Sequence, residues 1–185
     1  FLPSPEWKER AKGEKWFLGN TYHLAIGQGD LTMTPLQVAL ETAVIANGGK
    51  WCRPYLMENS KFQTPNSKQI SNSKFKTYKN QGSDCRDLGI KSEHLELVKR
   101  GMIEACSPGG TGFPFFNFEP RVGCKTGTAE VGDGTDDSHA WFTLFYPADH
   151  PEVVLTVLVE RGGSGAYVAA PIAKEIIERV REVRE

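Results

Sequence analysis

Four consecutive residues, Lys125, Thr126, Gly127 and Thr128, have the side chains needed to hold an extended peptide by its carboxylate. The lysine carries a cation and the next residue a hydroxyl, and a carboxylate binds well to such a pair of donors. Glycine has no side chain, so a ligand can lie close against the backbone beside it. Because extended peptides can pair with the edge of a strand, this motif predicts a carboxylate-binding strand edge.

A lysine followed by a threonine also ends the phosphate-binding loop of many nucleotide-binding proteins. That loop needs a glycine directly before the lysine and another glycine five residues earlier. Here Cys124 and Glu119 occupy those two positions. A bulky side chain and an acid would face the phosphates, so the sequence argues against nucleotide binding at Lys125.

Three extended segments in the last third of the chain would supply this strand and its neighbours. Residue types and turn signals predict strands over 122–129, 140–146 and 153–160, and their short polar connections favour an antiparallel meander. After them, a helix is expected from Ala170 that lies across the sheet. Its apolar residues at helical spacing are Ile172, Ile176 and Val180.

A helix is predicted before the sheet, beginning at Thr34. A threonine cap, a proline at the first helical position and a glutamine at the third together satisfy the free amides of a helix start. The sequence Asn-Gly-Gly at 47–49 would end this helix. The residues expected to share its buried face are Leu36, Leu40, Ala43 and Val44.

The remaining segments are less regular. Residues 57–91 are too polar to offset the entropy of ordering in a core, so we interpret them as a surface insertion with room for short strands. A second helix is expected from Ser92, as its N-cap, to Cys106. The first thirty residues lack a sustained period and are expected to be irregular. Helices followed by a meander and a packing helix indicate an α+β fold.

The overall composition excludes some classes of partner. The chain has 185 residues, of which 39% are hydrophobic, enough to form a core. Its 22 basic and 23 acidic residues nearly cancel, so no nucleic-acid partner is expected. No run approaches the roughly 18 apolar residues that cross a bilayer, and the opening FLPSPEW is no signal segment. Any membrane anchor is therefore expected outside this chain.

Cysteine and acidic residues give no metal pattern. The four cysteines lack zinc-type spacing and could pair in three ways, and buried free thiols are favoured over disulfides. On a strand, Cys124 should point away from the face of Lys125 and serve packing, with a reactive thiol as the sharper alternative. The acidic turn Asp133, Asp136 and Asp137 lacks a full set of calcium ligands. No metal or cofactor is expected.

Longer stretches of the chain resemble the class B penicillin-binding proteins, the peptidoglycan transpeptidases of cell elongation and division. The matching pieces are LPSPEW, GNTYHLAIGQGDLTMTPLQVALETAVIANGGKWCRPYL, GCKTGTAE, HAWFTLFYPADHPEVVLTVLVE and AAPIAKEI. They occur in the family's order, and LPSPEW favours the elongation type. The resemblance implies that residues 1–185 are the C-terminal part of a transpeptidase domain with the serine β-lactamase/transpeptidase-like fold.

The resemblance also implies roles for the four residues of the motif. Lys125 and Thr126 would bind the terminal carboxylate of a D-alanyl-D-alanine stem peptide or of a β-lactam. Gly127 would leave room for the acyl chain, and the backbone amide of Thr128 would donate one hydrogen bond in an oxyanion hole. The loop 27–29, Gly-Gln-Gly, is shared with the family and is expected to shape the fold near the site.

In this family an SxxK helix start and an SxN loop complete the site. The nucleophilic serine and the base lysine are expected upstream, so this chain alone should be inactive. A formal SxxK match runs from Ser71 to Lys74, but it follows the GQG and TPLQ segments and lies in the polar insertion, so we interpret it as fortuitous.

Partners and location follow from the same resemblance. The expected partners are the missing N-terminal half of the domain, a stem peptide or β-lactam, and a glycosyltransferase that pairs with the parent protein. The expected location is the outer face of the bacterial cytoplasmic membrane. Two alternatives stay open: a D,D-carboxypeptidase or β-lactamase of the same fold, and a non-catalytic penicillin-binding-like scaffold or pseudoenzyme. Because the sheet would be incomplete, we expect the isolated chain to be marginally stable or to self-associate.

Overall fold

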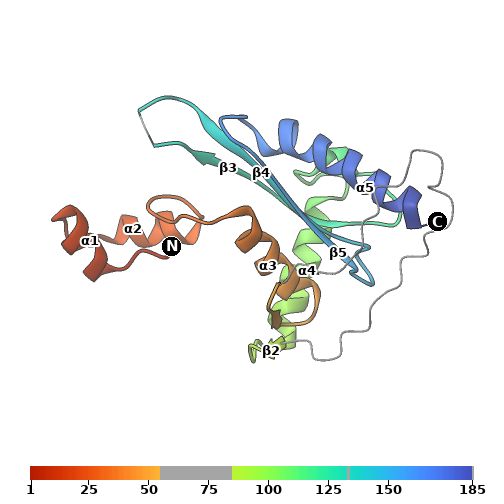
Figure 1. Cartoon of the computed structure of the whole chain (residues 1–185), viewed down its shortest axis with the longest axis horizontal. Coiled ribbons are helices and arrows are strands. Elements are labelled where there is room, and N and C mark those ends of the chain that lie inside the picture. The colour runs from red at the N-terminus through yellow and green to blue at the C-terminus, as the bar shows by residue number, and fades with distance from the viewer. Residues whose placement is uncertain (55–84, 133, 185) are drawn as a thin grey trace, which may run out of the picture.

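The computed structural model describes residues 1–54, 85–132 and 134–184. Its helices are α1 (Pro5–Lys12), α2 (Leu18–Ala25), α3 (Pro35–Ala46), α4 (Ser92–Ala105) and α5 (Ala170–Arg184). Its strands are β1 (Lys50–Cys52), β2 (Cys85–Asp87), β3 (Gly123–Glu130), β4 (Ser138–Tyr146) and β5 (Val153–Val159). A 3₁₀ turn, η1 (Phe113–Phe115), and a π-helical turn, η2 (Gly165–Ala169), complete the list. The predicted α+β fold is confirmed, and α1 and α2 form an arm that extends from the body (Figure 1).

The main sheet is the predicted antiparallel meander, with strand order β3-β4-β5. In its register Lys125 lies opposite Thr143 and Gly127 lies opposite Trp141. The observed strand ends differ from the predicted ones by one or two residues. In the described part of the chain β3 is an outer strand of this sheet, so the strand that carries the motif has one open edge.

One face of the sheet is covered by α5, as predicted, but with a different helix face. Ala170, Ala173 and Ile177 are fully buried against the sheet, whereas Ile172 and Ile176 are 41% and 39% exposed. The predicted buried stripe is therefore wrong by about one residue, or roughly 100° around the helix. The two alanines allow the helix backbone to come close to the sheet, so the larger isoleucines flank the contact.

The other face of the sheet meets α3 and α4. Phe145 of β4 packs there against Ala46 of α3 and Met102 of α4. The predicted start of α3 is confirmed, because Thr34 and Gln37 exchange hydrogen bonds of 3.2 and 2.8 Å between side chain and backbone. The predicted face of α3 is wrong at its start, where Leu36 is 58% exposed. Helix α4 begins one residue earlier than predicted: Ser92 is its first residue, and no side chain caps it.

The prediction that the first thirty residues are irregular is wrong, because α1 and α2 lie there. Ser4 caps α1 by accepting a hydrogen bond of 3.2 Å from the backbone N–H of Trp7, and Pro5 follows it at the first helical position. The ammonium group of Lys8 is buried between Glu14 and Asn20, with both distances at 3.1 Å. Ser4 and Pro5 repeat the signal recognised at Thr34, but an eight-residue helix is too short to show a period.

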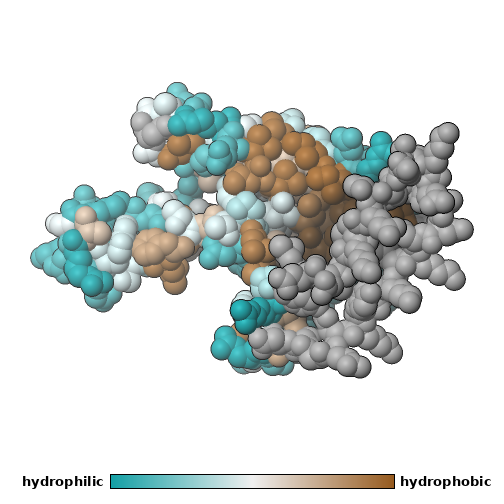
Figure 2. All heavy atoms as spheres, viewed as in Figure 1, coloured by the Kyte–Doolittle hydropathy of each residue, from teal (hydrophilic) through white to brown (hydrophobic). Residues whose placement is uncertain are grey.

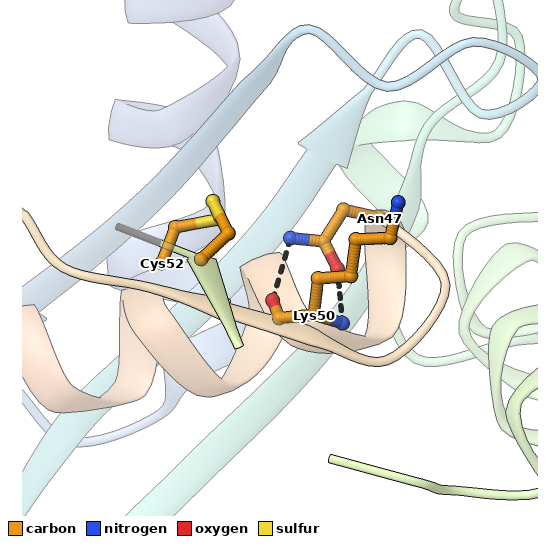
Figure 3. Close-up of a disulfide and its surroundings, with 4 residues drawn as sticks. Asn47, Lys50 and Cys52 are labelled. Carbon is orange, nitrogen blue, oxygen red and sulfur yellow. Dashed lines mark hydrogen bonds between the residues drawn. A yellow bond between two sulfur atoms is a disulfide. The ribbon is translucent and has the colours of Figure 1, made fainter. Parts of the chain in front are cut away.

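The four cysteines form two disulfides, Cys52–Cys85 and Cys106–Cys124, so the prediction of free thiols is wrong. The first bridge joins β1 to β2, where the two cysteines lie directly opposite each other. Figure 3 shows it beside a turn in which Asn47 and Lys50 exchange hydrogen bonds of 2.8 and 2.9 Å. Spacings of 33 and 18 residues carry no sequence signal for these pairs.

The polar insertion predicted at 57–91 lies mostly outside the described residues. Its described end contains β2, which is exposed at all three positions and pairs with β1.

Elsewhere on the molecule, hydrophobic side chains gather at the surface where the upper part of the sheet and the start of α5 lie (Figure 2). Tyr167 of η2 and Ile172 of α5 are among the exposed hydrophobic residues.

Candidate functional site

The four residues of the motif lie side by side on β3, at the open edge of the sheet. Lys125 and Thr128 are exposed, and Thr126 and Gly127 are half-buried. Because side chains alternate along a strand, Lys125 shares its face with Thr143 of β4, on the side of α3 and α4. Cys124 points to the opposite face and is fully buried, so its predicted packing role is confirmed. Its disulfide rules out the alternative of a reactive thiol.

The Lys125 ammonium group is available to an anion. Its Nζ donates a hydrogen bond of 2.6 Å to the backbone carbonyl of Thr126, its own neighbour on the strand. Within residues 1–54, 85–132 and 134–184 it forms no ion pair. An incoming carboxylate would therefore displace only one backbone contact.

Gly127 is in close contact with two neighbouring segments, β4 and η2. A Cβ atom on Gly127 would lie 3.0 Å from the Cβ of Trp141, across the strand pair. Gly165 of η2 contacts the same place, and a Cβ there would overlap the carbonyl oxygens of Trp141 and Gly127. The Gly165 N–H also donates to the hydroxyl of Thr128 at 3.4 Å. Contact with η2 therefore fixes the backbone of the motif.

The loop 27–29, which the family resemblance led us to expect near the motif, contacts the same strand. The side-chain amide of Gln28 donates a hydrogen bond of 3.1 Å to the backbone carbonyl of Thr128. Gly27 and Gly29, with φ of 74° and 75°, allow the tight turn on either side of it. The carbonyl and N–H of a strand residue point to the same edge. The Thr128 N–H therefore faces the open edge of β3.

A residue that the sequence did not single out lies beside Thr126. The Thr126 hydroxyl donates a hydrogen bond of 3.1 Å to the hydroxyl of Thr111, in the turn that follows α4. From the sequence we predicted only that the helix before this turn ends at Cys106. No spacing rule connects Thr111 with a strand 15 residues later.

Other candidate residues do not join this group. Asp137 pairs with Arg161 at 2.5 Å, and the Arg161 N–H donates to Nδ1 of His139 at 3.2 Å. Asp133 and the match from Ser71 to Lys74 lie outside the described residues. In the part of the chain that the structure describes, no cluster of His, Cys, Asp or Glu could hold a metal. In the same part, no helix is long and apolar enough to cross a membrane.

The site is an open strand edge and not a closed cavity. One surface pocket, of about 410 Å³, lies between η1 and α5, and another, of about 660 Å³, lies along α4. Neither is lined by a residue of the motif. A ligand at Lys125 would therefore lie along the edge of the strand, where the described residues leave it open on one side.

Comparison with known proteins gives one consistent family. The model described as "Penicillin binding protein transpeptidase domain" matches residues 5–178. The Haemophilus influenzae protein "Peptidoglycan D,D-transpeptidase MrdA" is 33% identical over 192 residues, which cover 96% of this chain and 28% of that protein. The Mycolicibacterium smegmatis protein "Peptidoglycan D,D-transpeptidase PbpA" is 33% identical over 163 residues, covering 83% of this chain and 30% of that protein.

Two solved structures share the fold. The crystal structure of Pseudomonas aeruginosa PBP2 in complex with WCK 5153 is 31% identical, with a TM-score of 0.75, and the match covers 97% of this chain and 37% of that one. The complex between PBP2 and MreC from Helicobacter pylori is 29% identical, with a TM-score of 0.78, and the match covers 99% of this chain and 31% of that one. The chain thus spans 28% to 30% of the length of the two curated relatives.

Proposed function

This chain belongs to the penicillin-binding protein transpeptidase family, and from that premise we propose that β3 is the carboxylate-binding wall of a peptidoglycan D,D-transpeptidase site. The substrate would be a stem peptide ending in D-alanyl-D-alanine, and a β-lactam would take its place. The observation that carries this proposal is the position of Lys125: among the described residues it is exposed, has no ion pair, and lies on a strand at the edge of its sheet.

Lys125 and Thr126 would bind the substrate's terminal carboxylate. The ammonium group can turn from the Thr126 carbonyl to an anion at the open edge of β3, and the Thr126 hydroxyl, which starts from the opposite face of the strand, can donate to the same anion across that edge. Such charge-assisted hydrogen bonds are about twice as strong as neutral ones. Binding at this end of the ligand would place the scissile bond one residue further along the strand.

Gly127 and Thr128 would serve the reacting carbonyl. Gly127 has no side chain to collide with the acyl portion of the ligand. The Thr128 N–H points to the open edge, where it can donate to the oxyanion that forms when the carbonyl is attacked. The hydrogen bond from Gln28 holds the Thr128 carbonyl at the same edge, which fixes the strand directly beside this N–H.

The nucleophilic serine and its lysine base would lie on a segment outside these 185 residues. In the reaction, the serine oxygen attacks the carbonyl of the penultimate D-alanine, and the terminal D-alanine leaves with a proton. The acyl group then passes to an amine of a second stem peptide. Without a serine and base this chain would bind but not turn over.

Location and partners are part of the same proposal. A peptidoglycan transpeptidase acts at the outer face of the cytoplasmic membrane, so we place the protein there, held by an anchor outside this chain. A glycosyltransferase that supplies glycan strands would be its working partner. The Helicobacter pylori PBP2 was solved with MreC, and a partner of that kind is proposed here as well.

The test is acylation of the full-length protein, encoded by the complete gene that contains this chain, by a fluorescent penicillin. Lys125→Gln should slow acylation by roughly 10- to 100-fold, because a hydrogen bond to a charged group contributes about 1.5–3 kcal/mol. Lys91→Gln, which changes an exposed lysine at the start of α4, should leave the rate unchanged. Failure of the wild-type protein to be acylated would favour a non-catalytic scaffold and overturn the proposal. Acylation followed by transfer to water alone would favour a carboxypeptidase or β-lactamase.

A further inference from the structure

The turn that carries Thr111 is joined covalently to the strand that carries Thr126. Cys106 caps the C-terminal end of α4, and Cys124 is the second residue of β3. The disulfide between them is buried, with Cys106 4% exposed and Cys124 fully covered. The peptide from 107 to 112 begins at one end of this bridge, so its position relative to β3 depends on the bridge.

The turn packs directly on the two sulfur atoms. A Cβ atom on Gly112 would lie 2.6 Å from the sulfur of Cys124 and 2.7 Å from that of Cys106, so no larger residue fits there without a shift. The Gly112 N–H donates a hydrogen bond of 2.7 Å to the carbonyl of Ala105, the last residue of α4. The bridge holds the peptide 107–112 at its start, next to Cys106, and this hydrogen bond holds it at its end, Gly112.

Thr111 precedes Gly112 and brings its hydroxyl to within 3.1 Å of the Thr126 hydroxyl. In this structure Thr126 donates and Thr111 accepts. Each hydroxyl can both donate and accept. When the Thr126 hydroxyl donates its hydrogen bond to a carboxylate instead, the Thr111 hydroxyl can turn and donate a hydrogen bond to the Thr126 oxygen. A donor behind the Thr126 oxygen polarises it and strengthens its bond to the anion.

We propose that the Cys106–Cys124 disulfide positions the Thr126 hydroxyl for carboxylate binding, and that Thr111 transmits this constraint. The inference rests on the proposed function, because it assigns a purpose to the geometry around Thr126. Thr111 is proposed as a positioning residue, because it contacts Thr126 and would act on the ligand through that hydroxyl. The redox state of one buried cystine would then control how well the site binds an anionic ligand.

The chain offers a matched control for the bridge. Cys52–Cys85 joins β1 to β2, and Cys85 is exposed while Cys52 is half-buried. The double variant Cys52→Ala with Cys85→Ala removes one disulfide and leaves the turn 107–112 unchanged. A general loss of stability would affect both pairs of variants, whereas loss of positioning would affect only Cys106→Ala with Cys124→Ala.

The first experiment measures acylation of the full-length protein by benzylpenicillin and by its methyl ester. Thr111→Val should slow acylation by benzylpenicillin about tenfold, the effect of one lost hydrogen bond of ordinary strength. Thr111→Ser keeps the hydroxyl and should stay within about twofold of wild type. The ester has no carboxylate, so Thr111→Val should not change its rate. A merely structural role of Thr111 would slow both compounds.

The second experiment follows acylation while dithiothreitol reduces the protein. Each cystine takes two electrons and two protons and becomes two thiols, and the dithiol becomes a cyclic disulfide. The exposed bridge at Cys85 should be reduced first and the buried one later, because reduction depends on access to sulfur. Acylation by benzylpenicillin should stay constant through the first phase and fall in the second. This readout does not depend on whether the alanine variants fold.

The outcomes separate this inference from the proposed function. Wild-type acylation that is unaffected by Thr111→Val and by loss of Cys106–Cys124 would overturn the inference and leave the proposed function standing. An equal effect of both disulfides would also overturn it. Failure of the wild-type protein to react with any penicillin would overturn both.

Discussion

The hydroxyl of Thr42 on α3 lies 2.8 Å from the hydroxyl of Thr143 on β4, and both side chains are buried. Thr42 also donates to the Val38 carbonyl at 2.9 Å, and Thr143 lies 2.8 Å from the hydroxyl of Thr156 on β5. Thr143 is the cross-strand neighbour of Lys125. A chain of hydroxyl groups therefore links α3 to the pair of strands β4 and β5, directly beside Lys125.

Thr143→Val should destabilise the protein, because it removes a partner from two other hydroxyls. A buried hydrogen bond contributes about 1 kcal/mol, and an unsatisfied partner costs about 1–3 kcal/mol. For a chain of this size each kcal/mol should lower Tm by roughly 2–4 °C, measured by calorimetry. The double variant Thr42→Val with Thr143→Val should lose less than the sum of the two single changes. Strict additivity would show that the hydroxyls do not interact.

Gly165→Ala should damage the site, because the new methyl group would overlap the carbonyl oxygens of Gly127 and Trp141. The turn η2 must then move away from β3, and the Thr128 hydroxyl loses its donor. We expect a drop in penicillin acylation of at least about tenfold, together with a lower Tm.

Gly101→Ala is the control for this prediction. Gly101 lies inside α4, and a Cβ there would meet nothing within 4 Å. Alanine at an unstrained helix position should raise stability by about 0.5–1 kcal/mol and leave acylation unchanged. If Gly165→Ala behaved like Gly101→Ala, the close contact between η2 and β3 would not matter for the site.

The sequence predicted the main sheet well because its signals are local. Residue types and short polar turns mark β3 to β5, and the cap at Thr34 is a pattern of four adjacent residues. The family resemblance singled out Lys125 as a candidate site residue, and the structure adds that its strand is an outer strand of the described sheet. The buried face of α5 was misjudged because hydrophobicity favoured the isoleucines, while close packing selected the alanines.

Contacts between distant segments were beyond sequence reasoning. The disulfide partners are 18 and 33 residues apart, and Gln28 meets Thr128 across 100 residues. Nothing in the local pattern around Thr111 distinguishes its hydroxyl from that of any turn threonine. Such partners are decided by how α4 and the arm pack on the sheet, which depends on the whole chain.

Gln28→Leu should loosen the strand on both sides of Thr128, because leucine fills a similar volume and has no donor for the Thr128 carbonyl. Amide hydrogen exchange over 127–130 should become faster, and acylation should slow by about 3- to 10-fold, the effect of one lost hydrogen bond. Gln28→Asn keeps the amide on a shorter side chain and should give an intermediate result. Unchanged exchange in Gln28→Leu would show that the 3.1 Å contact does not hold the strand.

The isolated 185-residue chain should self-associate in solution. Among the described residues β3 and β5 are the outer strands of the sheet, and unpaired strand edges template association. Large apolar side chains are exposed as well: Leu36 is 58% exposed on α3 and Leu97 is 60% exposed on α4. On α5, Ile172 and Ile176 lie one turn apart, so they form a continuous apolar stripe. Analytical ultracentrifugation should show species larger than a monomer at micromolar concentration.

Replacing the stripe tests whether it contributes to this association. Ile172→Lys with Ile176→Lys should shift the chain toward the monomer, because burying a charged side chain in an apolar contact is strongly unfavourable. Glu175→Lys reverses the charge at an exposed position of the same helix without removing apolar surface, so it should leave association unchanged. A wild-type chain that is monomeric and melts in one sharp transition would contradict the prediction. It would mean that the three-stranded sheet and its helices already form a sufficient core.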